Sequence, residues 1–184
     1  MILHFRNFIF DLLKNKQPKV TGTSLYPHQF LMEPSTATAS WYSAYPAPRS
    51  GAPNKITREE VLEALEGAES SGIRDFVLID VRRNDYEGGS IHGSINIPAQ
   101  SFYTTIPSWY SLFKAAGIKK AIWYCGSSRG RGTRSAMWFQ DYLDEKGDTE
   151  MKSMILIEGI KGWATAGNEY VERMDEYVRS FWNE

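Results

Sequence analysis

The sequence predicts an α/β fold of three layers, in which a central parallel sheet is flanked by helices. Three short apolar runs support this prediction: residues 76–81, 121–124 and 154–157. Unbroken apolar runs of this length are typical of parallel strands that are covered on both faces. Segments with helical spacing of apolar residues separate the runs, and that alternation favours helices packed on a single sheet.

The length and composition set the number of domains. The chain has 184 residues, of which 42% are hydrophobic and 14% aromatic, and this is enough for one sizeable core. We expect residues 54–184 to form that domain and residues 1–53 to be an N-terminal extension. The prolines of residues 34–53 predict an extended strap, and its aromatic side chains favour a position on the domain surface. These side chains are Trp41, Tyr42 and Tyr45.

The start of the chain and its single cysteine bear on localisation. Residues 1–13 carry a helical stripe of apolar residues, and lysines follow at positions 14, 16 and 19. Such a segment is compatible with mitochondrial targeting as well as with a helix docked on the domain. One cysteine cannot form an intrachain disulfide, and no apolar stretch is long enough to span a membrane. We therefore expect a cytoplasmic protein, with the mitochondrion as the alternative.

The first helix of the domain begins at a capping box. Thr57 can accept a hydrogen bond from the amide of Glu60, while the Glu60 side chain bonds back to the amide of Thr57. Apolar residues follow at helical spacing, and we expect Val61, Leu62 and Leu65 to be buried. This helix precedes the first apolar run of the sheet.

The second apolar run, residues 121–124, is followed at once by Cys125 and a loop rich in glycine and arginine. A helix begins near residue 133, and its inner positions follow at helical intervals: Ala136, Phe139, Gln140 and Leu143, of which Gln140 is the one polar break. Ligands of parallel sheets bind beyond the carboxyl ends of the strands. The cysteine lies at such an end.

The composition of the loop predicts a cysteine nucleophile beside an anion site. The residues between Cys125 and the helix include Gly126, Ser127, Ser128, Arg129, Gly130, Arg131 and Gly132. The three glycines provide backbone freedom for a sharp turn in which successive N–H groups converge on an anion. Arg131 lies six positions after Cys125, and its planar guanidinium can bind two oxygens of a tetrahedral oxyanion. Amides and arginines also stabilise a thiolate.

Three simpler interpretations account for parts of this pattern. A lone cysteine is often a small buried apolar residue, but the glycines and arginines around this one favour a nucleophile. A flexible basic loop can bind nucleic acid, but the net charge of −1 and the lack of a wider basic surface argue against it. A nucleotide-binding phosphate loop would need a lysine that this segment lacks.

Two further segments resemble a known family. Residues 78–98 read LIDVRRNDYEGGSIHGSINIP, and residues 156–163 read LIEGIKGW. The first segment resembles the signature of the rhodanese superfamily, in which a strand ends in Asp-x-Arg and a Tyr-Glu-x-Gly-x-Ile-x-Gly turn follows. The second is similar to the closing strand and turn of that family, which ends in a tryptophan packed under the domain. The resemblance implies a rhodanese-like fold with Trp163 in its core.

The length of the loop is similar to that of one branch of this superfamily. Cys125-x5-Arg131 resembles the loops of the dual-specificity cell-division-cycle phosphatases and of the eukaryotic arsenate reductases, whereas thiosulfate sulfurtransferases close theirs one residue sooner. The phosphatases usually have a histidine before the cysteine and carboxylates inside the loop, but this chain has Tyr124 and no acid there. A phosphomonoester needs a proton on its leaving oxygen, so this departure favours the arsenate reductases.

Four charged residues are candidates for supporting the loop: Asp80, Arg82, Arg134 and Glu158. We expect Asp80 and Arg82 to form a structural ion pair that holds the loop. Two roles are open for Arg134. It can contact the anion from outside the loop, or it can form an ion pair with Glu158. The side chain of Arg129 is expected to point to solvent.

The sequence thus predicts a cysteine-thiolate enzyme for a tetrahedral oxyanion. The resemblance implies an arsenate reductase that uses glutathione and a glutaredoxin, because the chain has no second thiol to close the reaction cycle. The alternatives are a phosphatase with an acid from outside the loop such as Glu158, a thiosulfate sulfurtransferase, and a non-catalytic module for anionic or phosphorylated partners. We expect no cofactor beyond glutathione as a co-substrate, and the three scattered histidines suggest no metal site.

Overall fold

The computed structural model describes residues 40–49 and 51–182 of the chain. The helix or targeting segment considered for residues 1–13 lies outside these residues. Within the described ranges, no helix is long and apolar enough to cross a membrane.

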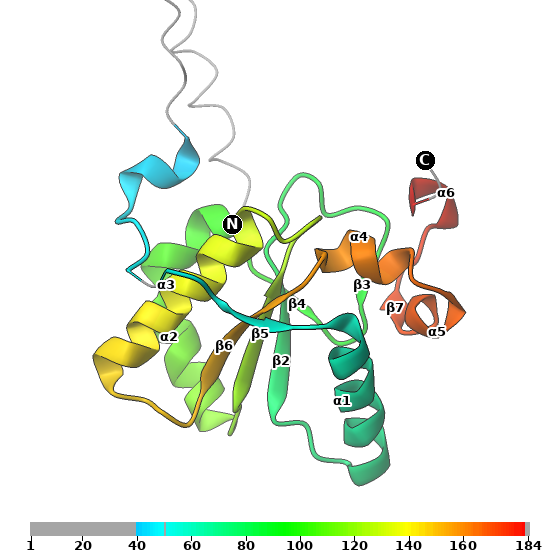
Figure 1. Cartoon of the computed structure of the whole chain (residues 1–184), viewed down its shortest axis with the longest axis horizontal. Coiled ribbons are helices and arrows are strands. Elements are labelled where there is room, and N and C mark those ends of the chain that lie inside the picture. Colours follow the sequence, from blue (N-terminus) through cyan, green and yellow to red (C-terminus); the bar gives the residue numbers. More distant parts are fainter. Residues whose placement is uncertain (1–39, 50, 183–184) are drawn as a thin grey trace, which may run out of the picture. The chain divides into compact units, whose positions relative to one another are not determined.

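A five-stranded sheet forms the middle layer of the domain (Figure 1). Its strands are all paired in parallel, in the order β1-β6-β5-β2-β4. Their bounds are β1 Asn54–Ile56, β2 Phe76–Asp80, β4 Ile95–Asn96, β5 Lys120–Tyr124 and β6 Lys152–Leu156. Because the strands run in one direction, the ends of β2, β5 and β6 bring Asp80, Cys125 and Glu158 to the same edge of the sheet.

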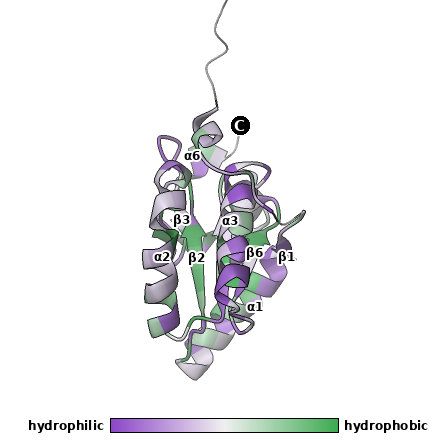
Figure 2. Cartoon of the chain, turned by 90° about the vertical axis from the view of Figure 1, so that its left-hand side faces the viewer, coloured by the Kyte–Doolittle hydropathy of each residue, from purple (hydrophilic) through white to green (hydrophobic). Residues whose placement is uncertain are grey.

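Helices cover both faces of this sheet (Figure 1). One face is covered by α2 (Ala99–Ala115) and α3 (Arg131–Lys146), and the other by α1 (Arg58–Ser71), α4 (Gly159–Ala164) and α5 (Asn168–Val171). The strands form the most hydrophobic layer, while the colouring of the helices is mixed (Figure 2). The predicted fold of three layers with a central parallel sheet is therefore confirmed.

Each face of the sheet has its own hydrophobic cluster. Trp123 and Phe139 belong to the cluster under α2 and α3, with ring centroids 5.3 Å apart. Tyr124 and Trp163 belong to the cluster under α1 and α4, and both side chains are fully buried. Trp163 donates from its indole nitrogen to the carbonyl oxygen of Tyr170 at 2.7 Å, which satisfies its polar group. The expected core position of Trp163 is confirmed.

The capping box at the start of α1 is also confirmed. The amide of Glu60 donates to Thr57 Oγ1 at 3.2 Å, and the amide of Thr57 donates to Glu60 Oε2 at 2.8 Å. The helix ends at Gly72, which has a φ of 70° and can adopt the left-handed conformation without strain. Val61 and Leu65 are buried as expected, whereas Leu62 is only partly buried.

Several short elements have no counterpart in the sequence-based prediction. They are β1, β4, an antiparallel pair formed by β3 (Ser90–Ile91) and β7 (Met174–Asp175), and α6 (Arg179–Trp182). Each contains four residues or fewer, so periodicity has too little length to reveal it. Pairing with strands that are distant in sequence, as between β1 and β6, forms these strands instead.

The aromatic strap before the domain packs against α2 and α3. Its 3₁₀ turn, Trp41–Ala44, places Trp41 edge-on to Trp138, with ring centroids 6.1 Å apart. Trp138 in turn donates from its indole nitrogen to the carbonyl oxygen of Pro46 at 2.9 Å. The expectation that these aromatics lie on the domain surface is confirmed for residues 41–46, and the domain boundary between residues 53 and 54 stays a prediction.

Candidate active site

Cys125 lies directly after β5, at the carboxyl edge of the sheet, and only 4% of it is exposed. A loop of residues 126–130 follows, and α3 begins at Arg131, two residues earlier than predicted. The loop therefore joins a buried strand to the N-terminus of a helix, where backbone N–H groups lack intrahelical partners. Such a place can hold an anion next to the thiol.

The N-terminus of α4 fixes the backbone of this loop. The amide of Ile160 donates to the carbonyl oxygen of Cys125 at 3.0 Å, and the amide of Lys161 donates to that of Gly126 at 2.9 Å. Gly159 permits this approach, because its φ is +60° and a Cβ there would overlap the Cys125 carbonyl oxygen. In a trans peptide the C=O and N–H groups point in opposite directions, so the next two amides of the loop point away from α4.

Ser128 makes the left-handed turn within the loop, with a φ of 55°. Its Oγ accepts a hydrogen bond from the amide of Cys125 at 3.5 Å, and its carbonyl oxygen accepts one from Thr133 Oγ1 at 2.5 Å. Within the described part of the chain, the amides of residues 126–131 donate to no protein acceptor. Successive unpartnered amides of this kind can bind an anion.

The glycines of the loop act differently from the prediction. None of Gly126, Gly130 and Gly132 has a positive φ. A Cβ at Gly132 would lie 2.9 Å from Ile155 Cδ1 and 3.3 Å from the amide nitrogen of Cys125, so close packing requires glycine there. Open space surrounds the Cβ positions of the other two. Gly130 nevertheless has a φ of −135° and a ψ of −86°, outside the regions that residues with a Cβ favour, so the predicted backbone freedom is used at Gly130, while Ser128 makes the left-handed turn.

Arg131 is bound by a carboxylate that the sequence reasoning missed. Its Nη1 and Nη2 donate to Oδ1 and Oδ2 of Asp85 at 2.6 and 2.5 Å. These hydrogen bonds lower the pKa of Asp85 well below its ordinary value and raise the pKa of Arg131. Asp85 occupies the end of the guanidinium, which leaves the N–H groups on the Nε side for a further ligand. The clamp role of Arg131 stays a prediction.

Asp80 and Arg82 form the expected buried ion pair. Arg82 Nη2 lies 2.7 Å from Asp80 Oδ2, and the two side chains are 2% and 0% exposed. Burial raises the pKa of Asp80, while the hydrogen bonds and charge of Arg82 oppose this rise. Arg82 also donates to the carbonyl oxygens of Glu87 at 2.8 Å and Gly89 at 2.6 Å. The pair therefore holds the segment of residues 83–89, which carries Asp85, rather than the cysteine loop itself.

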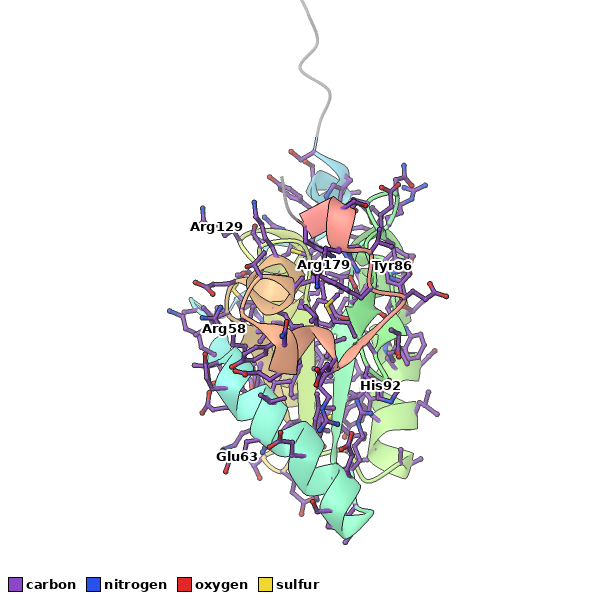
Figure 3. The ribbon with its side chains drawn as sticks, turned by 90° about the vertical axis from the view of Figure 1, so that its right-hand side faces the viewer. Arg58, Glu63, Tyr86, His92, Arg129 and Arg179 are labelled. Carbon is purple, nitrogen blue, oxygen red and sulfur yellow. The ribbon has the colours of Figure 1, made fainter. Side chains whose placement is uncertain are left out.

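The other charged candidates are more peripheral. Arg134 lies over the ring of Tyr42, with its guanidinium carbon 3.8 Å from the ring centroid, and Glu158 accepts a hydrogen bond from Arg58 at 2.8 Å. The ion pair considered between Arg134 and Glu158 is therefore not formed. Arg129 is exposed and projects outward from the loop (Figure 3), as expected. Ser127 is exposed as well.

The hydroxyl of Tyr124 belongs to the core. It donates to Ser94 Oγ at 2.8 Å and accepts a hydrogen bond from the amide of Ile91 at 3.3 Å. Burial raises the pKa of this phenol well above its ordinary value. The Tyr124 hydroxyl is therefore engaged within the core, and it does not take the place of the histidine that usually precedes the cysteine in the phosphatases.

The sequence contains only a partial signal for two residues of the site, Asp85 and Gly159. Asp85 follows the Asp80-x-Arg82 pattern by three residues, but it meets Arg131 across 46 positions of the chain. Gly159 lies in the segment read above as a closing strand and turn, and its contact with Cys125 depends on the packing of α4. Within the described ranges, no group of three or more His, Cys, Asp or Glu side chains is arranged to hold a metal ion.

Comparisons with known proteins agree with this fold. The chain is 29% identical over 108 residues to Arsenical-resistance protein 2 of Saccharomyces cerevisiae, which covers 55% of this chain and 83% of the yeast protein. The fold resembles that of the As-Sb reductase from Leishmania major, with a TM-score of 0.51, 23% identity, and coverage of 58% of this chain and 72% of that one. It also resembles a yeast protein tyrosine phosphatase of the rhodanese family, with a TM-score of 0.51, 21% identity, and coverage of 71% and 96%.

The family model of the rhodanese-like domain matches residues 57–166. This range begins at the capping box of α1 and ends after α4, so it includes the sheet from β2 to β6, the cysteine loop and the helix that supports it. It comprises more than half of the chain, and the chain belongs to the rhodanese-like domain family.

Proposed function

We propose that this protein is a cysteine-thiolate enzyme that reduces arsenate with glutathione, and that a glutaredoxin restores its thiol. The observation that carries the proposal is the loop directly after Cys125, where the amides of residues 126–131 have no acceptor among the described residues. Similarity to Arsenical-resistance protein 2 of yeast supports arsenate as the oxyanion.

The first step is a condensation at arsenic. The loop amides and the free side of Arg131 hold dihydrogen arsenate, and the sulfur of Cys125 attacks the arsenic atom. A sulfur–arsenic bond forms, one arsenic–oxygen bond breaks, and the departing oxygen leaves as water with the thiol proton and its own proton. Arsenate therefore brings part of the acid that this reaction needs.

The second step transfers electrons from sulfur to arsenic. A glutathione thiol attacks the sulfur of Cys125, a disulfide forms, and the electron pair of the sulfur–arsenic bond stays on arsenic. Arsenic is reduced by two electrons and leaves as arsenite with the proton of the thiol, while the two sulfurs are oxidised together. The chain has no other cysteine that could take this role, so the mixed disulfide needs an external thiol for its reduction.

A phosphatase of the cell-division-cycle type is the second candidate, and the length of the loop favours it equally. Phosphomonoester cleavage needs a general acid for the leaving alkoxide. Asp85 is a poor acid because Arg131 lowers its pKa, and Glu158 is engaged by Arg58. These pairings favour arsenate over a phosphoester. Thiosulfate transfer and anion binding without catalysis are further alternatives.

A panel of three assays tests the proposal. Arsenite formation is measured with arsenate, glutathione and glutaredoxin, phosphate release with para-nitrophenyl phosphate, and thiocyanate formation with thiosulfate and cyanide. We expect arsenite only, loss of that activity in Cys125→Ser, and a glutathione adduct on Cys125 by mass spectrometry. Release of phosphate without any thiol, together with no arsenite and no adduct, would assign the protein to the phosphatases.

A further inference from the structure

A cavity of about 670 Å³ adjoins the cysteine loop on the side of β1 and α4. Ser127, Ser128 and Arg129 form its wall on the loop side. Ser128 connects the cavity to the backbone of Cys125, because its Oγ accepts the hydrogen bond from the Cys125 amide. A cavity of this volume accommodates a small organic molecule, whereas a four-oxygen anion needs only a small part of it.

The charges around this cavity are mostly positive. Four cations line it, namely Lys55, Arg58, Arg129 and Lys161, and Glu158 is the one carboxylate in the lining. Arg58 is engaged by Glu59 and Glu158. The other three cations come from β1, the loop and α4, and each is exposed and has no ion-pair partner among the described residues. Figure 3 shows Arg58 and Arg129 on the same side of the molecule.

We propose that this cavity binds the thiol co-substrate of the reaction, a small peptide thiol with two carboxylates such as glutathione; this inference rests on the proposed function. The lone cysteine requires a thiol from outside, and the cavity adjoins the loop that follows this cysteine. Lys55 and Lys161 would receive the two carboxylates. Ile155 and Ile157 provide apolar surface for the chain between these charged ends.

This site gives the second chemical step its direction. A ligand anchored by its carboxylates is restricted to the side of the loop that carries Ser128, and its thiol approaches the sulfur of Cys125 from that side. The products are the mixed disulfide of Cys125 with the peptide and free arsenite, as in the electron balance given above. The oxyanion and the thiol then have separate binding sites on one loop.

The test uses S-methylglutathione, which keeps both carboxylates and the ammonium group but cannot react. Its binding to the full chain is measured by calorimetry for the parent protein, for Lys55→Ala, for Lys161→Ala and for the double variant. We expect the double variant to bind at least 10-fold more weakly. Lys152→Ala is the matched control, because Lys152 is an exposed lysine at the opposite end of β6. Equal binding by the double variant, or an equal loss in the control, would overturn the inference.

The outcome separates this inference from the proposed function. Lysine-dependent binding of S-methylglutathione supports the site even where arsenate is not reduced, since no reaction is needed for it. Arsenite formation with an unchanged KM for glutathione in the double variant overturns the site and leaves the proposed function intact. A rise in that KM with little change in kcat supports both. Both lysines are exposed, so their replacement is not expected to affect folding, and a thermal melt checks this.

Discussion

Gly159 lies outside the cysteine loop, but its replacement by alanine should distort the backbone of that loop. The new Cβ would overlap the carbonyl oxygen of Cys125 and lie 2.8 Å from that of Gly126, at a φ of +60°. A left-handed conformation costs an alanine about 1–2 kcal/mol. Separation of the overlapping atoms would also break the hydrogen bond from the Ile160 amide to Cys125, for about 1 kcal/mol more. We expect a total loss of about 2–3 kcal/mol in the free energy of unfolding.

This loss is measurable by thermal and chemical unfolding. It corresponds to a decrease in Tm of about 4–12 °C for a domain of this size. Sulfate affinity, followed by calorimetry, should decrease as well, because the loop amides lose their orientation. Gly67→Ala is the control, since Gly67 lies in α1 with open space at its Cβ and should gain about 0.5–1 kcal/mol. A Gly159→Ala variant with the Tm and sulfate affinity of the parent would refute the reasoning.

Three further predictions concern individual charges. Arg131→Lys keeps the charge but loses the planar fork, so sulfate should bind on the order of 10-fold more weakly with no change in Tm; equal binding would show that Arg131 is not the clamp. Asp85→Asn removes a negative charge that opposes an anion on the same guanidinium, and at about 1 kcal/mol of repulsion sulfate should bind about 5-fold more tightly. Weaker binding would instead mean that the carboxylate's main effect is to orient Arg131. Lys114 lowers the pKa of Asp148 to about 2, so this carboxylate stabilises the fold above its ordinary pKa near 4, and the contribution is lost as the pH falls toward 2. Urea unfolding should show Asp148→Asn to be about 1–2 kcal/mol less stable than the parent at pH 7, with a smaller difference at pH 2.5, and a difference independent of pH would contradict this assignment.

The elements that could be predicted are those with a signal in their own stretch of sequence. The central strands β2, β5 and β6 are continuous apolar runs, and the capping box at Thr57 specifies the start of α1 within four residues. β1 and β4 have no such signal, because they consist of three and two residues and exist only by pairing with β6 and β2. The local sequence pattern thus predicts the three central strands, and pairing with these strands forms the two short ones.

The same distinction applies to the candidate site. The order of cysteine, loop and arginine is a local property, and the structure keeps it. The partner of Arg131 and the support of the loop come from Asp85 and Gly159, which are distant in sequence from the residues that they contact. The ion pair considered between Arg134 and Glu158 shows the limit of local reasoning, because Arg134 lies over Tyr42 and Glu158 binds Arg58. Residue order along the chain thus predicted the position of the loop, whereas it did not predict the contacts that support it.

The buried pair of Asp80 and Arg82 has a consequence for how the domain opens. Arg82 connects a central strand to the segment that carries Asp85, and Asp85 holds Arg131. The guanidinium of Arg131 is thus connected to a buried central strand through the two carboxylates of Asp85 and Asp80. Opening of this segment would leave the Arg82 guanidinium in the interior without its carbonyl acceptors, so it should occur only when the whole domain unfolds. Hydrogen exchange at the amides of residues 81 and 82 would then proceed by global unfolding, and the site would share a single cooperative unit with the sheet.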